Sequence, residues 1–513
     1  MSVGPGFLAS APMRLSLAAA ALYCLGMALA WAAFSTQMPV DWGFELVLTQ
    51  QLKPFYAVSN PPLYTWIAWG LQRVLPPDQS ILLIVNYFAN FALFWLTAMV
   101  GHRVLKDRVL AAVAPWSLFV IIPYGRLNFG YVNTQLLLPF ILASVLILLA
   151  IGRRPRWVLF VTLGLVVGLG TLAKLNYLFA IVCLLGAACL QPRLRAALAK
   201  PWIALSVILA LAVVAPFAVA FYDAGNDLMA LLHSKTAARA PLGYGAQVTS
   251  GLASAALGMA LYLGPALLIG LAGAVLARGE RKDDEERAAG RRFFRDALIA
   301  GVVVILAGIF IFGIASLKTW YLHAFFLVAP LYALSFWDKE RVPANLRLAV
   351  CGVVLGFAVV QTATRVVEFT PYCQGKCRDV VPYDKLAQHL RQAGFERGTI
   401  LSHGVRVGGN LRPYFPRSRV GVLGPRRLPP RARGQIGQCL VIWRVDEVKS
   451  QTDVRRAAAK TLIAVGLPVE AGDTPVRSIR LGLRGWPASG RAGRPGAVVW
   501  RYILIAKGNA RCG

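Results

Sequence analysis

Long apolar runs alternate with short polar connectors over the first 366 residues of the chain. A helix needs about 20 consecutive apolar residues to cross a bilayer. Eleven runs approach or reach this length, at 13–34, 80–101, 109–124, 135–152, 158–173, 175–190, 202–221, 252–277, 298–316, 320–337 and 348–366. The third, fifth and sixth are short, so we expect them to be tilted or broken. Residues 1–366 are therefore predicted to form a mostly α-helical, polytopic membrane domain of about 11 transmembrane helices.

The polar connectors predict the orientation of these helices, because Lys and Arg accumulate in the cytoplasmic loops of membrane proteins. All the basic connectors fall on one side if the N-terminus is cytoplasmic, and the loop at 35–79 then faces outward, as does the chain after the last run. Arg14 precedes the first run and no convincing small-residue cleavage site follows, so we expect a retained first helix. The basic connectors lie at 102–108, 153–156, 191–200, 278–295 and 338–347.

From residue 367 onward Gly, Pro and Arg become frequent and no further run could span a membrane. The segments TILSHG and CLVIWRV are typical of strands, and YDKLAQHLRQAGF has helical spacing of its apolar residues. Residues 367–513 are therefore predicted to form an exported α/β or α+β domain. Its many arginines indicate either a solvated surface or attraction to anionic lipid or polysaccharide.

The overall composition supports a membrane protein and excludes several other classes. With 57% hydrophobic and only 15% charged residues, a chain of this length has too much apolar surface for a soluble globular protein. The net charge of +31 is explained by basic connectors that attract anionic lipid, so we expect no nucleic-acid partner. No GxxxxGK[ST], GxGxxG or HExxH motif occurs, which leaves no motif for nucleotide hydrolysis, dinucleotide binding or zincin chemistry.

The eight cysteines divide by location. Four lie in apolar runs and four in the exported part, where an even number in an oxidising compartment predicts two disulfides. The pairs Cys373–Cys377 and Cys439–Cys512 are the simplest of the three pairings. The CQGKC spacing would also suit a zinc site, which stays the alternative.

The first outward loop, at 35–79, is unusually polar for a connector between spans. Asp41 and Glu45 are four residues apart, so on a helix both carboxylates share one face. Such a pair next to a membrane segment is costly unless it meets a cation, a metal or a substrate. From Leu63 the apolar spacing predicts a short amphipathic helix, preceded by Pro61 and Pro62, that lies on the membrane surface.

Other polar residues that face outward in this topology include several cations: Arg126, Lys174, Lys235 and Lys318. Cations around an acid pair suit a substrate that carries phosphate. Lys174 interrupts a long apolar stretch, so it either snorkels to the surface or has an anionic partner. Lys318 would equally be explained as an anchor at the end of a helix.

Several segments resemble a known family. NPPLYTWI, GLGTLAKLNY, LHSK and KTWYLHAFFLVAPLYAL resemble the bacterial glycosyltransferase family 39-like and aminoarabinose transferase-like proteins of the protein mannosyltransferase superfamily, which have the GT-C fold. PPLYTW followed by a spanning helix is the most specific of these elements. GQCLVIWRV and GGNLRPYFPRSRV also resemble the exported tail of a proteobacterial branch of this group.

The resemblance implies an inverting glycosyltransferase in the bacterial inner membrane. It implies a polyprenyl-phosphate-linked sugar as donor and a periplasmic-side acceptor such as lipid A or lipopolysaccharide, another glycolipid, a glycan or a protein. It also implies Asp41 as general base, with Glu45 as its partner, both beside a divalent cation such as Mg²⁺ or Mn²⁺. Here Trp42 and Gly43 follow Asp41, where many relatives have a second acid.

Further site roles follow from the same resemblance. The residues expected to bind the donor phosphate are Arg126, Lys174, Lys235 and Lys318, and those expected to contact the rest of the substrates are Asn60, Tyr64, Asn133, Tyr321 and His323. Two other classes stay open. A transporter or flippase would need charges deep within several spans, whereas most ionisable groups here lie near one face. A non-catalytic envelope assembly protein would act through its exported domain.

Overall fold

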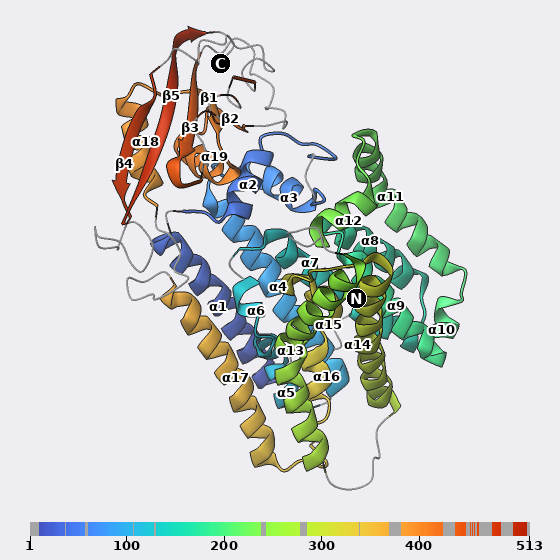
Figure 1. Ribbon diagram of the computed structural model, residues 1–513. Helices are drawn as coiled ribbons and strands as arrows, with labels where there is room; N and C mark the ends of the chain where they lie inside the picture. The colour runs from blue at the N-terminus through green and yellow to red at the C-terminus, as the bar shows by residue number, and fades with distance from the viewer. Residues whose placement is uncertain are drawn as a thin grey trace. The chain divides into compact units, whose positions relative to one another are not determined.

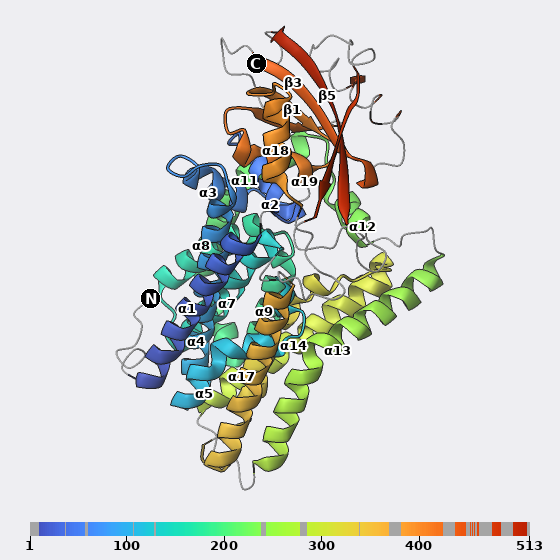
Figure 2. The ribbon, with the colours of Figure 1, turned by 90° about the vertical axis from the view of Figure 1, so that its left-hand side faces the viewer.

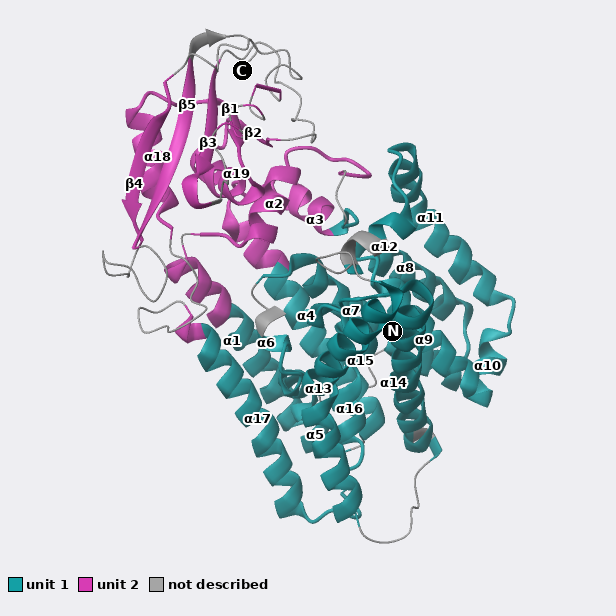
Figure 3. Cartoon of the chain, in the orientation of Figure 1, with its two compact units in different colours: residues 1–25, 57–63, 86–365 teal, residues 26–56, 64–85, 366–513 magenta. Residues whose placement is uncertain are grey.

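The computed structural model describes residues 10–35, 37–56, 60–105, 107–127, 130–236, 243–277, 285–337, 339–368, 381–423, 437–447, 452, 454, 456, 459–460, 475–483 and 496–509. Most of these residues are helical, and a five-stranded sheet lies in the C-terminal part (Figure 1 and, from the side, Figure 2). The chain divides into two compact units (Figure 3). Unit 1 comprises residues 1–25, 57–63 and 86–365, and unit 2 comprises residues 26–56, 64–85 and 366–513.

Seven helices in the described part of the chain are long and apolar enough to cross a membrane. They coincide with seven of the predicted runs, because a helix satisfies its backbone polar groups within the segment itself. Their bounds are α1 Ala11–Phe34, α4 Gln79–Leu105, α7 Val132–Arg153, α11 Trp202–Asp223, α13 Tyr244–Leu276, α14 Glu285–Phe312 and α17 Ala344–Val367.

The four other predicted runs are helical but short or interrupted. They form α5 Arg108–Val113 with the 3₁₀ helix η1 Ala114–Val120; α8 Trp157–Ala173; α9 Tyr177–Leu190, followed by α10 Pro192–Leu198; and η2 Thr319–Tyr321 with α15 His323–Phe326 and α16 Ala329–Leu334. Prolines Pro115, Pro192 and Pro330 stand in the first turn of η1, α10 and α16, where proline starts a new segment rather than continuing the last. The described helices thus give seven candidate spans, or eight if α9 and α10, which are bent by 113°, count as one span. The predicted number of about 11 transmembrane helices is not confirmed.

Four shorter helices connect these segments: α2 Val40–Leu48, α3 Leu63–Leu71, α6 Tyr124–Leu127 and α12 Leu228–Thr236. The two helices expected in the first outward loop are α2 and α3. Asp41 and Glu45 both lie on α2, as their spacing predicts. That α3 lies on a membrane surface stays a prediction.

A buried carboxylate links two helices of unit 1, α5 and α17. The carboxylate of Asp107 accepts hydrogen bonds from the backbone N–H groups of Val109, at 2.8 Å, and Leu110, at 3.0 Å, and so caps the start of α5. The same carboxylate forms an ion pair with Arg347 of α17. Asp107 is only 5% exposed, so its charge is compensated where water cannot reach it.

The C-terminal part of unit 2 is a mixed α/β fold. Its elements are α18 Tyr383–Gln392, β1 Gly398–Ser402, α19 Val405–Leu411, η3 Arg412–Tyr414, β2 Arg419–Val422, β3 Gly437–Arg444, η4 Val445–Glu447, β4 Arg477–Gly482 and β5 Ala497–Asn509. The strand order is β2-β1-β3-β5-β4, with β1 parallel to β2 and β3, and β5 antiparallel to β3 and β4. The helix and the two strands expected from the sequence are α18, β1 and β3.

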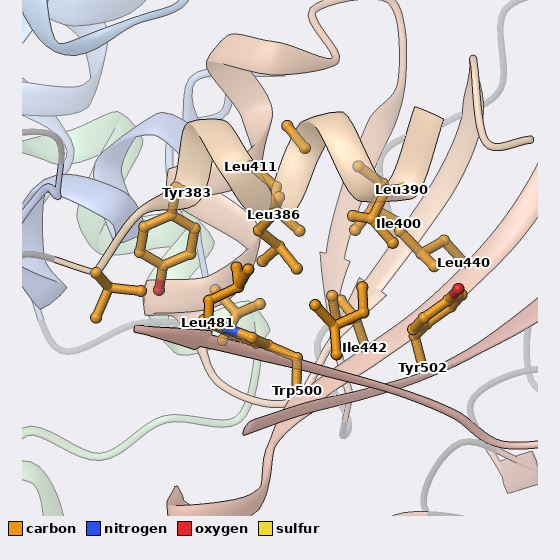
Figure 4. Packing of buried hydrophobic residues seen from close by; sticks show 14 of the residues in the cluster. Tyr383, Leu386, Leu390, Ile400, Leu411, Leu440, Ile442, Leu481, Trp500 and Tyr502 are labelled. Carbon is orange, nitrogen blue, oxygen red and sulfur yellow. The ribbon is translucent and has the colours of Figure 1, made fainter. Parts of the chain in front are cut away.

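Helices α18 and α19 cover one face of this sheet. Leu386 of α18 and Leu411 of α19 belong to the same buried cluster as Ile442 of β3 and Trp500 of β5 (Figure 4). The residues that alternate with these in β3, including Cys439, belong to a separate buried cluster, as expected when successive side chains point to opposite faces.

Cys439 is disulfide-bonded. The other cysteines of the predicted disulfides, Cys373, Cys377 and Cys512, lie outside the described residues, so the pairing stays a prediction. The cysteines of the predicted spans are free; they are Cys24, Cys183, Cys189 and Cys351.

Candidate active site

The two carboxylates of α2 lie in different environments within unit 2. Asp41 is half-buried in the first turn of the helix, where the positive end of the helix dipole favours a negative charge. Glu45, one turn further, is only 2% exposed. The hydroxyl of Thr65 on α3 donates a hydrogen bond to Glu45 Oε2 at 2.6 Å. Asp41 is therefore the more accessible group, while Glu45 is held by the neighbouring helix.

Two tyrosines flank Glu45. Burial raises the pKa of Tyr56 to about 12, and the nearby charge of Glu45 adds to the effect. Burial likewise raises the pKa of Tyr64 well above its usual value, again with a contribution from Glu45. Both phenols are therefore neutral hydrogen-bond donors at physiological pH. The Tyr56 hydroxyl donates to the carbonyl of Gln51 at 2.8 Å and so fixes the loop after α2.

Trp42, between the two acids, is fully buried against the end of α1. Its ring stacks on that of Trp31, with centroids 4.7 Å apart and planes 26° from parallel. Both rings are completely inaccessible to solvent. This contact holds α2 against the end of α1, because stacked aromatic rings bury a large area in a defined geometry.

Helix α2 packs directly on α19 of the C-terminal fold, and both belong to unit 2. Gly43 and Gly409 meet backbone to backbone, since a Cβ atom at residue 409 would lie 2.1 Å from the carbonyl oxygen of Gly43. Only glycine permits so close an approach. Val47, one turn further along α2, packs against the apolar cluster between α18, α19 and the sheet.

Side-chain amides hold both ends of the α2 segment. Asn410 accepts a hydrogen bond from the Met38 N–H at 2.7 Å and donates one to the Met38 carbonyl at 3.2 Å. Gln50 does the same to Val420 of strand β2, accepting from its N–H at 2.7 Å and donating to its carbonyl at 2.8 Å. Each amide hydrogen-bonds to both the N–H and the carbonyl of one distant residue. These paired bonds fix the position of the α2 segment relative to α19 and β2.

Arg412 supplies a charged contact at the C-terminal end of α2. Its guanidinium is 5% exposed and donates to the hydroxyl of Thr49, the residue that follows the helix, at 2.8 Å. Burial lowers the pKa of Arg412 to about 9. A cation at this position faces the negative end of the helix dipole. We call this whole contact the α2 seam; it consists of Met38, Gly43, Val47, Thr49, Gln50, Gly409, Asn410, Arg412 and Val420.

A second group of predicted site residues lies in unit 1. The Lys174 ammonium, just after α8, donates a hydrogen bond to the Thr134 hydroxyl of α7 and lies 5.6 Å from the ring centroid of Tyr321. Asn133, the neighbour of Thr134, is buried in the same helix. Because its ammonium has a hydroxyl and an aromatic face as partners, Lys174 is bound by the protein rather than simply extended toward the surface.

The other outward-facing residues of unit 1 behave differently from one another. Lys318 is exposed and lies 5.6 Å from the ring centroid of Trp320, which stacks on Tyr131 with centroids 4.9 Å apart. His323 is fully buried and hydrogen-bonded to the hydroxyl of Tyr262. A buried histidine with a fixed phenol partner is positioned to support the fold rather than to meet a substrate directly.

The structure groups some of the predicted site residues and leaves others outside its description. Asp41, Glu45 and Tyr64 belong to unit 2, whereas Asn60, Asn133, Lys174, Lys318, Tyr321 and His323 belong to unit 1. The side chains of Arg126, on α6, and Lys235, on α12, lie outside the described part. Sequence reasoning missed the α2 seam entirely; its one signal was the pair of glycines in VGGNLRP.

An apolar cavity of about 370 Å³ lies among α8, α9 and α11 of unit 1. Phe217 and Phe221 line it on α11, and Leu175, the residue after Lys174, lines it as well. The cavity thus lies next to Lys174, and its volume is within the range typical of ligand pockets.

The described side chains offer few ligands for the divalent cation expected from the sequence. Among the described residues no group of three or more His, Cys, Asp and Glu side chains could hold a metal ion. At most Asp41 and Glu45 could contribute, and Glu45 already accepts from Thr65. Mg²⁺ in such a place would take its other ligands from water and substrate phosphate.

Comparisons with known proteins bear on these observations. The family model described as dolichyl-phosphate-mannose-protein mannosyltransferase matches residues 59–219. Two lipopolysaccharide core galacturonosyltransferases of Rhizobium johnstonii are similar over most of their length. RgtA is 25% identical, covering 84% of this chain and 87% of its own, and RgtB is 24% identical, covering 75% and 78%.

A solved structure resembles the whole chain. This is ArnT from Cupriavidus metallidurans bound to undecaprenyl phosphate, with a TM-score of 0.55, 14% identity and coverage of 96% of this chain and 98% of that one. At this identity the likeness concerns the fold, which is that of the GT-C class. Together with the named relatives it confirms the resemblance drawn from the sequence motifs. The chain is a multi-pass membrane glycosyltransferase with the GT-C fold.

Proposed function

We propose that this enzyme transfers a sugar from a polyprenyl-phosphate donor to a lipopolysaccharide-type glycolipid at the periplasmic face of the bacterial inner membrane, with inversion and with Asp41 as general base. One observation carries the assignment of the base: α2 presents one half-buried carboxylate, Asp41, while its second carboxylate, Glu45, is buried and bonded to Thr65. A base must reach the proton that it removes, and Asp41 is the accessible one.

The proposed step is a single displacement. The acceptor hydroxyl gives its proton to the Asp41 carboxylate while its oxygen attacks the anomeric carbon, and the bond from that carbon to the phosphate oxygen breaks. Attack opposite to the leaving phosphate inverts the anomeric configuration. Glu45 acts through position: its bond to Thr65 and its neighbours Tyr56 and Tyr64 hold the face of α2 that carries Asp41.

The leaving polyprenyl phosphate gains negative charge and needs cations. Lys174 is suited to this, because its ammonium is already oriented by Thr134 and Tyr321 and an apolar cavity begins at the next residue. We propose that the cavity takes part of the polyprenyl chain. Lys318 and, outside the described side chains, Arg126 and Lys235 are the further candidates for the phosphate.

The relatives suggest the substrates. RgtA and RgtB are named for transfer of galacturonic acid to the lipopolysaccharide core, and the ArnT structure holds undecaprenyl phosphate. We therefore propose a uronic acid as the sugar and a lipopolysaccharide core as the acceptor. A cytoplasmic N-terminus with the C-terminal fold in the periplasm is part of the proposal, because the basic connectors favour that orientation.

The test is transfer by the purified full chain in nanodiscs, with polyprenyl-phosphate galacturonic acid as donor and core lipopolysaccharide as acceptor. Asp41→Asn should lower the rate at least about 100-fold, because general base catalysis contributes that much. Asp223→Asn, the same change at an exposed carboxylate, should not alter it. Wild-type rates in Asp41→Asn protein would exclude the base. Mass analysis of envelope glycolipids from cells without the gene should show one missing sugar.

A further inference from the structure

A second cavity in unit 1, of about 580 Å³, is lined by arginines. It lies where the ends of α4 and α7 meet α10 and the first turns of α14. Four arginines and one carboxylate contribute to the wall: Arg103, Arg153, Arg193, Arg292 and Glu285. Among the described residues of the wall, positive charges thus outnumber negative ones. No step of the proposed transfer uses this cavity.

The carboxylate among these described residues, Glu285, belongs to the rim of the cavity. Glu285 pairs with Arg193 at 2.6 Å, and both side chains are about two-thirds exposed, 67% and 68%. That pair belongs to the rim, where solvent screens ion pairs. Arg103 lies deeper and donates to the backbone carbonyl of Leu146 at 3.2 Å. Its charged neighbour is Arg153, another cation, so the two guanidiniums repel each other.

The cavity also has an apolar side. Val104, Leu149, Leu194 and Phe293 line it together with the arginines. An apolar wall beside guanidiniums at the ends of two spanning helices matches a ligand with a charged head and a hydrocarbon body. Guanidinium groups bind phosphate oxygens in pairs, and basic pockets between transmembrane helices bind the head groups of anionic lipids.

We propose that this cavity binds the phosphate head group of an anionic phospholipid, with the phosphodiester on Arg103 and Arg153 and the start of the acyl chains against the apolar wall. Four of the five basic connectors noted in the sequence contribute a residue to it: 102–108, 153–156, 191–200 and 278–295. These arginines are therefore more than a general positive-inside signal, since they line one cavity. Bound lipid would hold α4, α7, α10 and α14 together at this end.

The test compares two double variants that lose the same charge. Arg103→Gln/Arg153→Gln removes the partly buried guanidinium of Arg103 and the more exposed guanidinium of Arg153, and glutamine keeps a hydrogen-bonding side chain at both positions. Arg154→Gln/Arg156→Gln removes two exposed arginines of the same connector that do not line the cavity. Binding of phosphatidylglycerol and cardiolipin to the purified full chain is measured by native mass spectrometry, and thermal unfolding is followed with the same lipids, with phosphatidylcholine and with inorganic phosphate.

We expect anionic lipid to be retained by wild type and by Arg154→Gln/Arg156→Gln, with a rise in melting temperature of a few degrees. Arg103→Gln/Arg153→Gln should bind it at least about tenfold more weakly, as expected for the loss of charge-assisted hydrogen bonds. Equal binding by both variants would mean general attraction to charge and would overturn the proposal. An equal rise with inorganic phosphate would overturn it in favour of a free-anion site. If the first variant fails to fold, Arg292→Gln provides the comparison.

Discussion

Replacing Gly409 with alanine should test whether the C-terminal fold positions the proposed base. Gly409 lies in helix α19, where alanine is intrinsically favoured over glycine by about 1 kcal/mol. Any loss must therefore come from the contact with α2. The added Cβ would lie 2.1 Å from the Gly43 carbonyl oxygen and 2.3 Å from its Cα, whereas ordinary contact begins at 3.4 Å. Because both partners are backbone, the two helices must separate by roughly 1 Å.

The expected effect is larger on the rate than on stability. Overpacking costs about 1–3 kcal/mol, and part of this is offset by the higher helix propensity of alanine. A displacement of about 1 Å in a catalytic group can lower a rate about 100-fold. We expect Gly409→Ala to fold, to melt a few degrees lower and to lose about 100-fold in kcat, with KM for the donor changed much less, because the donor phosphate is assigned to residues of unit 1.

Two alanine variants serve as matched controls. At Gly43 the added Cβ would lie 3.3 Å from the Val405 carbonyl oxygen, a tight but tolerable contact, so Gly43→Ala should lower kcat only slightly. At Gly70 of α3 nothing lies within 4 Å, so Gly70→Ala should keep full activity. Initial rates in nanodiscs give kcat for each variant, and thermal unfolding gives its melting temperature. If Gly409→Ala has the kcat of Gly70→Ala, the idea that the α2 seam positions the base is refuted.

Two further predictions concern the buried polar groups around α2. Thr65→Val should destabilise the protein by about 1.5–3 kcal/mol, which is the usual cost of losing a hydrogen bond to a charged group. Thr65→Ser keeps the hydroxyl and should have nearly the stability of wild type. Equal melting temperatures for the valine and serine variants would contradict this prediction. Because burial lowers the pKa of Arg412 from 12.5 to about 9, its charge opposes folding below pH 9, and this cost is relieved as the pH rises from 9 toward 12.5. Arg412→Met should therefore gain stability relative to wild type at pH 7, and the difference should narrow by pH 10; a difference that widens with pH would show that the guanidinium is stabilising in its charged form.

The sequence predicted the features that depend on neighbours along the chain. Hydrophobic runs mark spanning helices because the bilayer selects apolar residues over a fixed length, and seven such helices appear among the described residues. Spacing placed Asp41 and Glu45 on one helix, and local pattern found α18, β1 and β3. Prolines at Pro115, Pro192 and Pro330 marked the interruptions that hydropathy alone passed over.

The features that sequence reasoning missed depend on contacts between distant segments. Asn410 and Met38 are 372 positions apart, and no local pattern links them. The spacing of Asp41 and Glu45 likewise gave them equal status, since it places both on one face. Their burial differs because α3 packs over Glu45 and supplies the Thr65 hydroxyl, which is a tertiary contact. Strands β4 and β5 were also not predicted. Their place in the sheet depends on pairing, since β5 pairs with β3 and β4 pairs with β5.

A nine-residue helix such as α2 is too short to be stable by itself, because nucleation of a helix is costly and short helices depend on tertiary packing. Its stability must therefore come from its contacts. Those within unit 2 are the stacked Trp31, the Thr65 hydroxyl and, from the C-terminal fold, Gly409, Asn410 and Val420. Most of these partners come from the far end of the chain. The position of the helix that carries the proposed base therefore depends on the C-terminal fold as well as on its neighbours along the chain.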